Sequence, residues 1–296
     1  VESLPLDGET VAALDYRTYH GGKGANQAVA ACRQDVSVKM IGAVGDDSNG
    51  QTYLENLRQE GIDVSGVVKV KEPTGAAFIT VDDEGENTIV CATGANSMVG
   101  RDAVDRSGEI FSDSAAVLAQ FEVPGPTVAE AAVSAELRGV PFILNAAPFF
   151  PTYSWTDAPT TYLIVNEREA TDLLEFVPSF IDEPMVRQRI CELRVENLII
   201  TRGSSETWVF TKGGEAFSVE TLPVLPIDTV GAGDAFAGCF AARIAMGSSL
   251  VDAVRAANCA GALTTLGGGA QSPIPNFDQV EQHIAQISEP IYLSQK

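Results

Sequence analysis

The chain has 296 residues, of which 45% are hydrophobic, and a formal net charge of −21. This length and composition predict a globular protein with a single large domain. The acidic balance argues against nucleic acid as a partner, because phosphate backbones bind basic surfaces. No apolar run approaches the ~20 residues of a membrane-spanning helix, so no membrane partner is expected. The five cysteines lack CxxC spacing and lie among apolar or small residues, which predicts buried free thiols and a cytoplasmic location.

Two segments are predicted to form a small antiparallel lid. Residues 9–20 precede the first α/β unit, and residues 75–93 contain two apolar runs joined by the polar turn DDEGEN. Two such runs around a short polar turn are typical of a β-hairpin. Both segments interrupt the pattern of the remaining chain, so we expect them at one edge of the domain.

The stretch GGKGANQAVAACR (residues 21–33) joins glycines to a helical pattern. The glycines would let the backbone approach a ligand closely. Lys23 and Asn26 supply the polar side chains, and the amide of Asn26 can both donate and accept, which suits sugar hydroxyls. The alternative is a flexible turn that starts a helix, with Lys23 in solvent.

From about residue 36, short apolar runs alternate with helical patterns. The expected strands cover residues 38–45, 115–122, 140–148, 161–167 and 196–203. The expected helices cover residues 49–61, 127–139, 167–175, 184–194 and 277–287. Near-continuous apolar strands separated by helices predict an α/β fold, in which helices cover both faces of a mostly parallel sheet.

The stretch DTVGAGDAFAG (residues 228–238) places glycines before a second apolar helix. A helix N-terminus has unpaired N–H groups and a dipole that favour an anion. Asp234 lies in the first turn, where it could simply stabilise its own helix. A dinucleotide loop, and with it a dehydrogenase, is disfavoured because the third glycine of GxGxxG is out of register. The remaining interpretation is an anion site beside a base, as phosphoryl transfer to an alcohol requires.

The two glycine stretches together resemble the paired signatures of the ribokinase (PfkB-type) family of carbohydrate kinases. The similarity covers essentially the whole chain. Seven further stretches match in order, namely GAVGDDSNG, NTIVCATGAN, LAQFEVP, LNAAP, VNEREA, TRGSSE and GGGAQSPIP. Either glycine stretch alone would be a weak signal, whereas nine matches in order are specific.

The resemblance implies a kinase that transfers the γ-phosphoryl group of ATP, with Mg²⁺, to the 5-hydroxyl of ribose. Asp234 would be the base, and the N–H groups of Ala232, Gly233 and Asp234 would form the anion hole, with Gly231 as a further catalytic-site residue. The implied sugar-binding residues are Gly22, Lys23, Gly24, Asn26, Glu122 and Asp234. The implied ATP-binding residues are Asn166, Thr201, Gly203, Ser204, Glu206, Gly233 and Asn258. Without the resemblance, Glu122 reads as a strand-end charge in solvent and Asn166 as a helix N-cap.

The lid strands carry apolar side chains such as Ala77, Ile79 and Val81, and a small sheet cannot bury both of its faces alone, so we expect a homodimer formed through the lid. The resemblance also implies an activating K⁺ ion. The residues that match the cation loop are Asp228, Val230, Thr264, Gly267 and Gly269. Pro273 departs from the family, which often has serine there, and proline lacks both a hydroxyl and an N–H. Cation activation is therefore less firmly implied than catalysis.

The stretch LPLDGET (residues 4–10) resembles the part of these kinases that follows their first strand and a sugar-binding loop. We therefore expect about 20 further residues before Val1, enough for one strand and its loop.

Three alternatives remain open. One is a kinase of another pentose or nucleoside, such as deoxyribose or pseudouridine. The second is a non-catalytic regulator on the same fold that binds sugar or nucleotide. The third, a dehydrogenase, is disfavoured by the glycine register.

Overall fold

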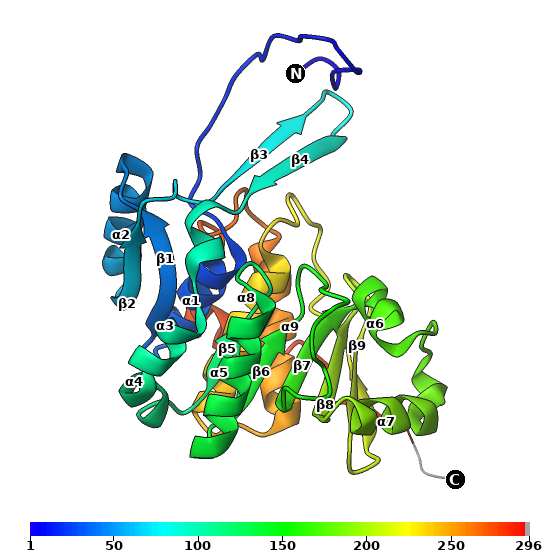
Figure 1. Ribbon diagram of the computed structural model, residues 1–296. Helices are drawn as coiled ribbons and strands as arrows, with labels where there is room; N and C mark the ends of the chain where they lie inside the picture. The colour runs from blue at the N-terminus through cyan, green and yellow to red at the C-terminus, as the bar shows by residue number, and fades with distance from the viewer. Residues whose placement is uncertain (294–296) are drawn as a thin grey trace.

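The computed structural model describes residues 1–293 and contains a seven-stranded central sheet (Figure 1). Its strands, in spatial order, are β11 (Ile291–Tyr292), β10 (Ala216–Val219), β9 (Thr207–Thr211), β8 (Val195–Thr201), β7 (Thr160–Asn166), β6 (Phe142–Asn145) and β5 (Val117–Ala119). Strands β5 to β8 are parallel, whereas β9, β10 and β11 continue the sheet antiparallel. The half of the sheet that contains β5 to β8 is therefore parallel, and the other half is antiparallel.

Helices cover both faces of this sheet. One face packs against α3 (Arg101–Arg106), α4 (Gly108–Ser112), α5 (Gly125–Arg138), α6 (Glu167–Leu174) and α7 (Glu183–Glu192). The other face packs against α8 (Ala232–Ala245), α9 (Leu250–Thr264) and α10 (Phe277–Ile284). The paired residues Leu144, Leu163 and Leu198 belong to the first core, and their neighbours Ile143, Ile164 and Ile199 to the second. Burial on both faces explains the continuous apolar runs in the sequence.

A second, two-stranded parallel sheet contains β1 (Lys39–Gly45) and β2 (Asp63–Val70). It packs against α1 (Lys23–Cys32) and α2 (Ser48–Gln59). Among the described residues no strand joins β1 to β5, so the two sheets are separate.

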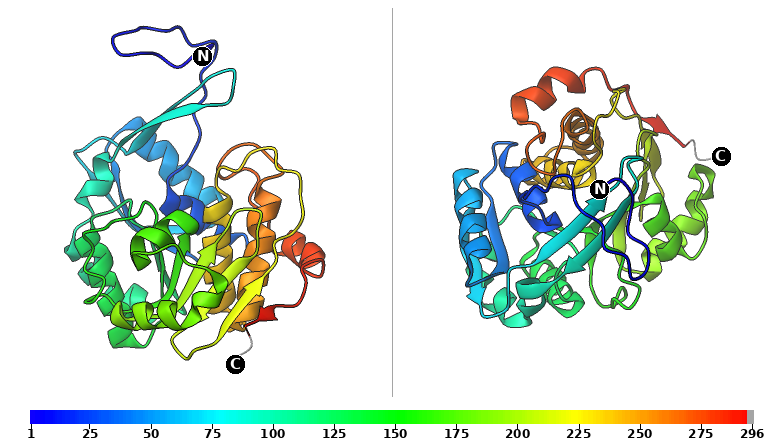
Figure 2. Two further views of the ribbon diagram at one scale, coloured as in Figure 1. Left: turned by 90° about the vertical axis from the view of Figure 1, so that its right-hand side faces the viewer. Right: turned by 90° about the horizontal axis from the view of Figure 1, so that it is seen from above.

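The lid is the hairpin of β3 (Ala76–Val81) and β4 (Asn87–Ala92), which projects from the body (Figures 1 and 2). The hairpin expected over residues 75–93 is therefore present. Residues 9–20 differ from the expectation, because they run beside the lid without forming a strand. They pair with neither β3 nor β4, which form a sheet of two strands only, and Tyr16 is 87% exposed. Two short 3₁₀ helices, Gly94–Met98 and Phe180–Asp182, complete the elements.

Helices α1 and α8 approach each other closely through Gly238. A Cβ atom on Gly238 would lie 2.3 Å from the carbonyl oxygen of Gln27 and 2.6 Å from the Cβ of Ala30. Only glycine allows this separation without displacing a helix. The contact brings the residues at the start of α1 next to Asp234 on α8.

Within residues 1–293, no helix is both long enough and apolar enough to cross a bilayer. The five cysteines, all in the described part of the chain, are free thiols, as expected, but Cys91 and Cys191 are exposed rather than buried.

Candidate active site

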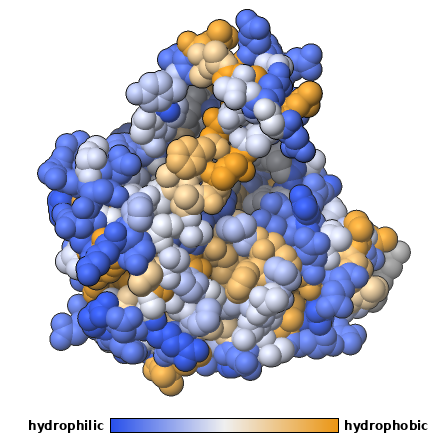
Figure 3. Space-filling model, turned by 45° about the horizontal axis from the view of Figure 1, so that its top comes forward, coloured by the Kyte–Doolittle hydropathy of each residue, from blue (hydrophilic) through white to orange (hydrophobic). Residues whose placement is uncertain are grey.

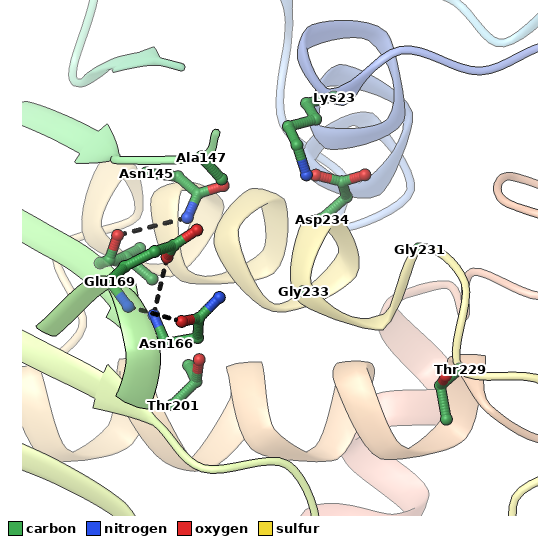
Figure 4. Close-up of a pocket in the computed structure, with 11 residues that line it drawn as sticks. Lys23, Asn145, Ala147, Asn166, Glu169, Thr201, Thr229, Gly231, Gly233 and Asp234 are labelled. Atoms are coloured by element: carbon green, nitrogen blue, oxygen red, sulfur yellow. Dashed lines mark hydrogen bonds between the residues drawn. The ribbon is translucent and has the colours of Figure 1, made fainter. Parts of the chain in front are cut away.

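Polar side chains gather at the carboxyl ends of the parallel strands. Glu122 follows β5, whereas Asn145, Asn166 and Thr201 are the last residues of β6, β7 and β8. Ligands of open α/β sheets bind at this edge. The N-terminus of α8 faces the same edge and closes a cavity of about 250 Å³ (Figure 4). The lining residues are Lys23, Asn145, Ala147, Ile164, Asn166, Glu169, Thr201, Thr229, Gly231, Gly233 and Asp234.

The start of α8 contains two glycines, of which the geometry requires Gly231. Gly231 caps the helix with φ +80°, and a Cβ there would lie 2.5 Å from the carbonyl oxygen of Ala270. At Gly233 a Cβ would meet no atom within 4 Å, so this residue faces open space. The first N–H groups of a helix lack intrahelical partners and carry its positive dipole end. The cavity wall can therefore stabilise an anion, as expected from the sequence.

Asp234 lies in the first turn of α8 and is 7% exposed. Its Oδ2 atom accepts a hydrogen bond of 2.9 Å from the amide of Asn26, and its Oδ1 atom accepts one of 2.9 Å from the amide of Gln27. Both donors come from α1. The structure thus brings Asp234 together with Lys23 and Asn26, which lie more than 200 positions earlier in the chain.

Glu122 stands at the start of α1 rather than in solvent. Its Oε2 atom accepts a hydrogen bond of 2.7 Å from the backbone N–H of Lys23. The same oxygen lies 3.6 Å from the position a Cβ would take on Gly22, which has φ +89°. Burial raises the pKa of Glu122, partly offset by the Lys23 N–H. Gly24 also packs closely, because a Cβ there would lie 3.1 Å from the side-chain oxygen of Gln120.

Asn166 and Glu169 lie on the opposite side of the cavity from Asp234 (Figure 4). The Oδ1 atom of Asn166 accepts the backbone N–H of Glu169, and the Glu169 carboxylate accepts that of Asn166. This capping box starts α6, so Asn166 is a helix N-cap that also faces the cavity. Burial raises the pKa of Glu169.

Four further ATP-binding candidates lie at the end of β8 and in the turn that leads to β9. The hydroxyl of Thr201 donates to the Val165 carbonyl and lines the cavity. Gly203, at φ +60°, and Ser204 lie in the exposed turn after β8. Glu206 accepts hydrogen bonds from Arg202 and Trp208.

Asn258 is buried in α9, and both the oxygen and the nitrogen of its side-chain amide form hydrogen bonds within the protein. Its Oδ1 atom accepts from Thr207, and its Nδ2 atom donates to the carbonyls of Val219 and Glu220. The side chain does not line the cavity, so its expected role near the nucleotide stays a prediction.

The expected cation loop is held together by Asp228. One carboxylate oxygen accepts the N–H of Val230 and the other that of Gly269, each at 3.0 Å. These bonds join the loop before α8 to the loop after α9. Thr264 ends α9, and Gly267 lies against the ring of Pro273.

Several residues of this site were not predicted from the sequence. Asn145 and Glu169 line the cavity, and Gln27 binds Asp234. The signal for Glu169 was present, because an Asn followed three residues later by Glu marks a helix start. Gln27 carries no comparable signal within an alanine-rich helix.

Residues 1–276 match the model of the pfkB family of carbohydrate kinases. The chain belongs to this family. It is 36% identical over 281 residues to a ribokinase of Bacillus subtilis, with 95% of this chain and 93% of that protein covered. It is also 31% identical over 285 residues to a deoxyribokinase of Salmonella typhi, with 95% and 93% covered.

A solved structure of Arabidopsis thaliana ribokinase complexed with ribose and ATP superposes with a TM-score of 0.87. The two chains are 28% identical, and the match covers 96% of this chain and 93% of the other. The family and the fold together make this protein a carbohydrate kinase, which transfers a phosphoryl group to a sugar hydroxyl.

Proposed function

We propose that the protein transfers the γ-phosphoryl group of ATP to the 5-hydroxyl of D-ribose, with Asp234 as the base. One observation carries the proposal. Asp234 lies in the first turn of α8, in the wall of a cavity that Lys23 and Asn166 also line. The similarity to a ribokinase that binds ribose and ATP supports this choice of substrates.

Asp234 accepts the proton of the 5-hydroxyl as that oxygen attacks the γ-phosphorus. The bond from the γ-phosphorus to the bridging oxygen breaks, and ADP leaves. The N–H groups of residues 232–234 face the charge that develops on the phosphoryl oxygens. Such preorganised donors are worth most at a helix N-terminus shielded from water.

Glu122, Lys23 and Asn26 bind the sugar, together with the backbone of Gly22 and Gly24. The buried carboxylate of Glu122 has one oxygen bonded to Lys23 N–H and keeps acceptor sites for hydroxyl groups. Hydroxyl groups of the sugar would donate hydrogen bonds to this carboxylate in place of those from water that it loses on burial.

The nucleotide phosphates lie between the start of α8 and the start of α6. Glu169 and Asn166 supply hard oxygen donors, which suit Mg²⁺ held jointly with substrate phosphates. Among residues 1–293 no group of three His, Cys, Asp or Glu side chains could hold a metal alone. This arrangement fits a Mg²⁺ site that is completed by phosphate oxygens of the nucleotide. Mg²⁺ would offset the phosphate charge there.

A K⁺ ion would bind at Asp228 with the carbonyls of Val230, Thr264, Gly267 and Gly269. Each Asp228 oxygen accepts one N–H and retains a second lone pair, so the carboxylate could still contact a cation. Pro273 offers no hydroxyl to such a site. Activity in K⁺ compared with equal ionic strength of tetramethylammonium tests this assignment.

We also propose a homodimer formed through the lid, in a reducing cytoplasm where the free thiols persist. The hairpin exposes apolar side chains from both strands, as Figure 3 shows on the projecting segment. A two-stranded sheet cannot bury both faces by itself.

The similarity to a deoxyribokinase favours 2-deoxyribose as the second candidate substrate. A coupled assay of ADP release over ribose, 2-deoxyribose, other pentoses and pseudouridine separates the candidates. The proposal predicts the highest kcat/KM for ribose. A higher value for 2-deoxyribose would replace ribose by that sugar, and no ADP release with any sugar would favour a binding protein.

Asp234→Asn tests the base directly. Asparagine keeps the shape but cannot take the proton, so kcat is expected to fall ~10²–10⁴-fold while the variant still binds sugar. A variant within threefold of the wild-type kcat would show that Asp234 is not the base.

A further inference from the structure

Two consecutive residues of α1 hold the Asp234 carboxylate, one at each oxygen. Asn26 donates to Oδ2 and Gln27 to Oδ1, both at 2.9 Å. Gln27 is 0% exposed and is not among the residues that line the cavity. Because it lies behind the cavity wall, it can act on the reaction only through the lining residues that it holds, which are Asp234 and Asn145.

The amide of Gln27 is itself held in one orientation. Its nitrogen also donates to Oδ1 of Asn145 at 2.9 Å, and its oxygen accepts from the amide of Gln120. A flipped amide would set its oxygen against the oxygens of Asp234 and Asn145 and its nitrogen against the Gln120 donor. The positions of the amide nitrogen and the amide oxygen of Gln27 are thus fixed by the acceptors and the donor around them.

The second donor is held from the other side of the site. The oxygen of Asn26 accepts from the amide of Gln271 at 3.0 Å, and the oxygen of Gln271 accepts from Asn56 on α2 at 3.2 Å. The carboxylate thus sits in a continuous network of neutral amides. Buried networks whose members are all satisfied rigidify the groups they contain.

We propose that Gln27 is a positioning residue, which fixes the rotation of the Asp234 carboxylate so that its free lone pairs face the sugar hydroxyl. This inference rests on the proposed role of Asp234 as the base. A carboxylate has two equivalent oxygens and a soft terminal torsion, so its direction must be set by partners. Neutral amides set it without changing the net charge of the site.

The test compares Gln27→Met with Gln34→Met. Gln34 is also 0% exposed, donates to the Pro275 carbonyl and accepts from Arg243, but has no contact with Asp234. Both variants lose buried hydrogen bonds. We expect Gln27→Met to lower kcat ~10–100-fold, as small displacements of a reacting group do, with little change in the ribose KM. Gln34→Met should lower the melting temperature while leaving kcat near the wild-type value.

Gln27→Glu gives a second readout in a side chain of the same size. It places a carboxylate against Asp234, so the two groups share a proton and the acid limb of the kcat/KM profile moves to higher pH. The other titratable groups around Asp234 are Lys23 on α1, Tyr53 on α2, Glu122 after β5 and Glu169 across the cavity. All of them stay unchanged in this variant, so the shift reports on position 27.

A crystal structure of Gln27→Met reports on the carboxylate without any assay. We expect the Asp234 carboxylate in a rotated or second conformation. An unrotated carboxylate, or a kcat loss no larger than that of Gln34→Met, would overturn the proposal. Failure of the proposed function would show instead as wild-type kcat in Asp234→Asn, so the two are distinguishable.

Discussion

The Oε2 atom of Glu122 accepts a hydrogen bond of 2.7 Å from the backbone N–H of Lys23, 99 positions earlier in the chain. The bond ties the loop after β5 to the first residue of α1. Because Glu122 is held there while half-buried, its carboxylate is preset to meet a ligand that approaches the glycines.

Glu122→Gln should weaken ribose binding and leave ATP binding unchanged. Glutamine can still accept the Lys23 N–H, so the change removes the charge and keeps the contact. Hydrogen bonds to a charged group contribute about 1.5–3 kcal/mol, which corresponds to a roughly 10- to 150-fold rise in Kd. Calorimetry with each substrate measures this, and Glu130→Gln on α5 is the control. Unchanged ribose affinity would contradict the assignment.

Glu169→Gln should stabilise the substrate-free protein at neutral and basic pH. Burial raises the pKa of Glu169 above its ordinary 4.5, so the protonated form is favoured in the folded state. That contribution is complete below the ordinary value and is lost as the pH rises through the raised one. Glutamine keeps the capping box, so the gain in melting temperature should be near zero at pH 4 and positive at pH 8.

Glu84→Gln, in the exposed turn of the lid, provides the control for Glu169→Gln. It removes the same charge from a chain whose net charge is −21, without changing a buried group. An equal gain in both variants would assign the effect to net charge rather than to burial.

Gly238→Ala should lower both stability and kcat. The new Cβ would lie 2.3 Å from the Gln27 carbonyl oxygen, so α1 and α8 must separate. Overpacking of this kind costs typically about 1–3 kcal/mol, and the separation draws the α1 amides away from Asp234. Urea unfolding and steady-state kinetics measure the two effects. Gly213→Ala is the control, since a Cβ there meets no atom closer than 3.6 Å. A normal kcat would mean that the helices accommodate the methyl group without moving Asp234.

Phe78→Asp should convert the proposed dimer to a monomer. Phe78 lies opposite Val90 on one face of the lid, and Ile79 lies opposite Ile89 on the other; all four are more than half exposed. A charge on the first face would face apolar side chains of the second copy. Sedimentation velocity measures the state, with Val177→Asp, an exposed apolar site off the lid, as control. A wild-type protein that stays monomeric at every concentration would refute the dimer.

The sequence predicted the parallel strands of the central sheet, whose residues are buried on both sides, but it missed the antiparallel strands β9 and β10, which are also largely buried. Residues 161–167 and 196–203 read as apolar runs because β7 and β8 lie between two helix layers. Strand β2 was missed because Asp63, Ser65 and Lys69 interrupt its apolar pattern, as an edge strand with exposed positions allows.

The site was predictable where a motif marks backbone geometry. The glycines at positions 22, 231 and 233 mark left-handed or open backbone, which no other residue type signals so directly. The partners of Asp234 were not predictable in the same way. Gln27 reaches it only because α1 and α8 touch at Gly238, and this crossing depends on packing across 207 positions of sequence.

The contact at Gly238 also has a consequence for motion. The sugar-side glycines lie at the start of α1, and the anion site lies at the start of α8. Because the backbone of α8 at Gly238 packs directly against α1, we expect the N-termini of the two helices to move as one rigid unit. In the proposed reaction this contact would hold the acceptor hydroxyl and the phosphoryl group at a fixed separation. We therefore expect the movements that admit substrates and release products in the lid and in the exposed turn after β8.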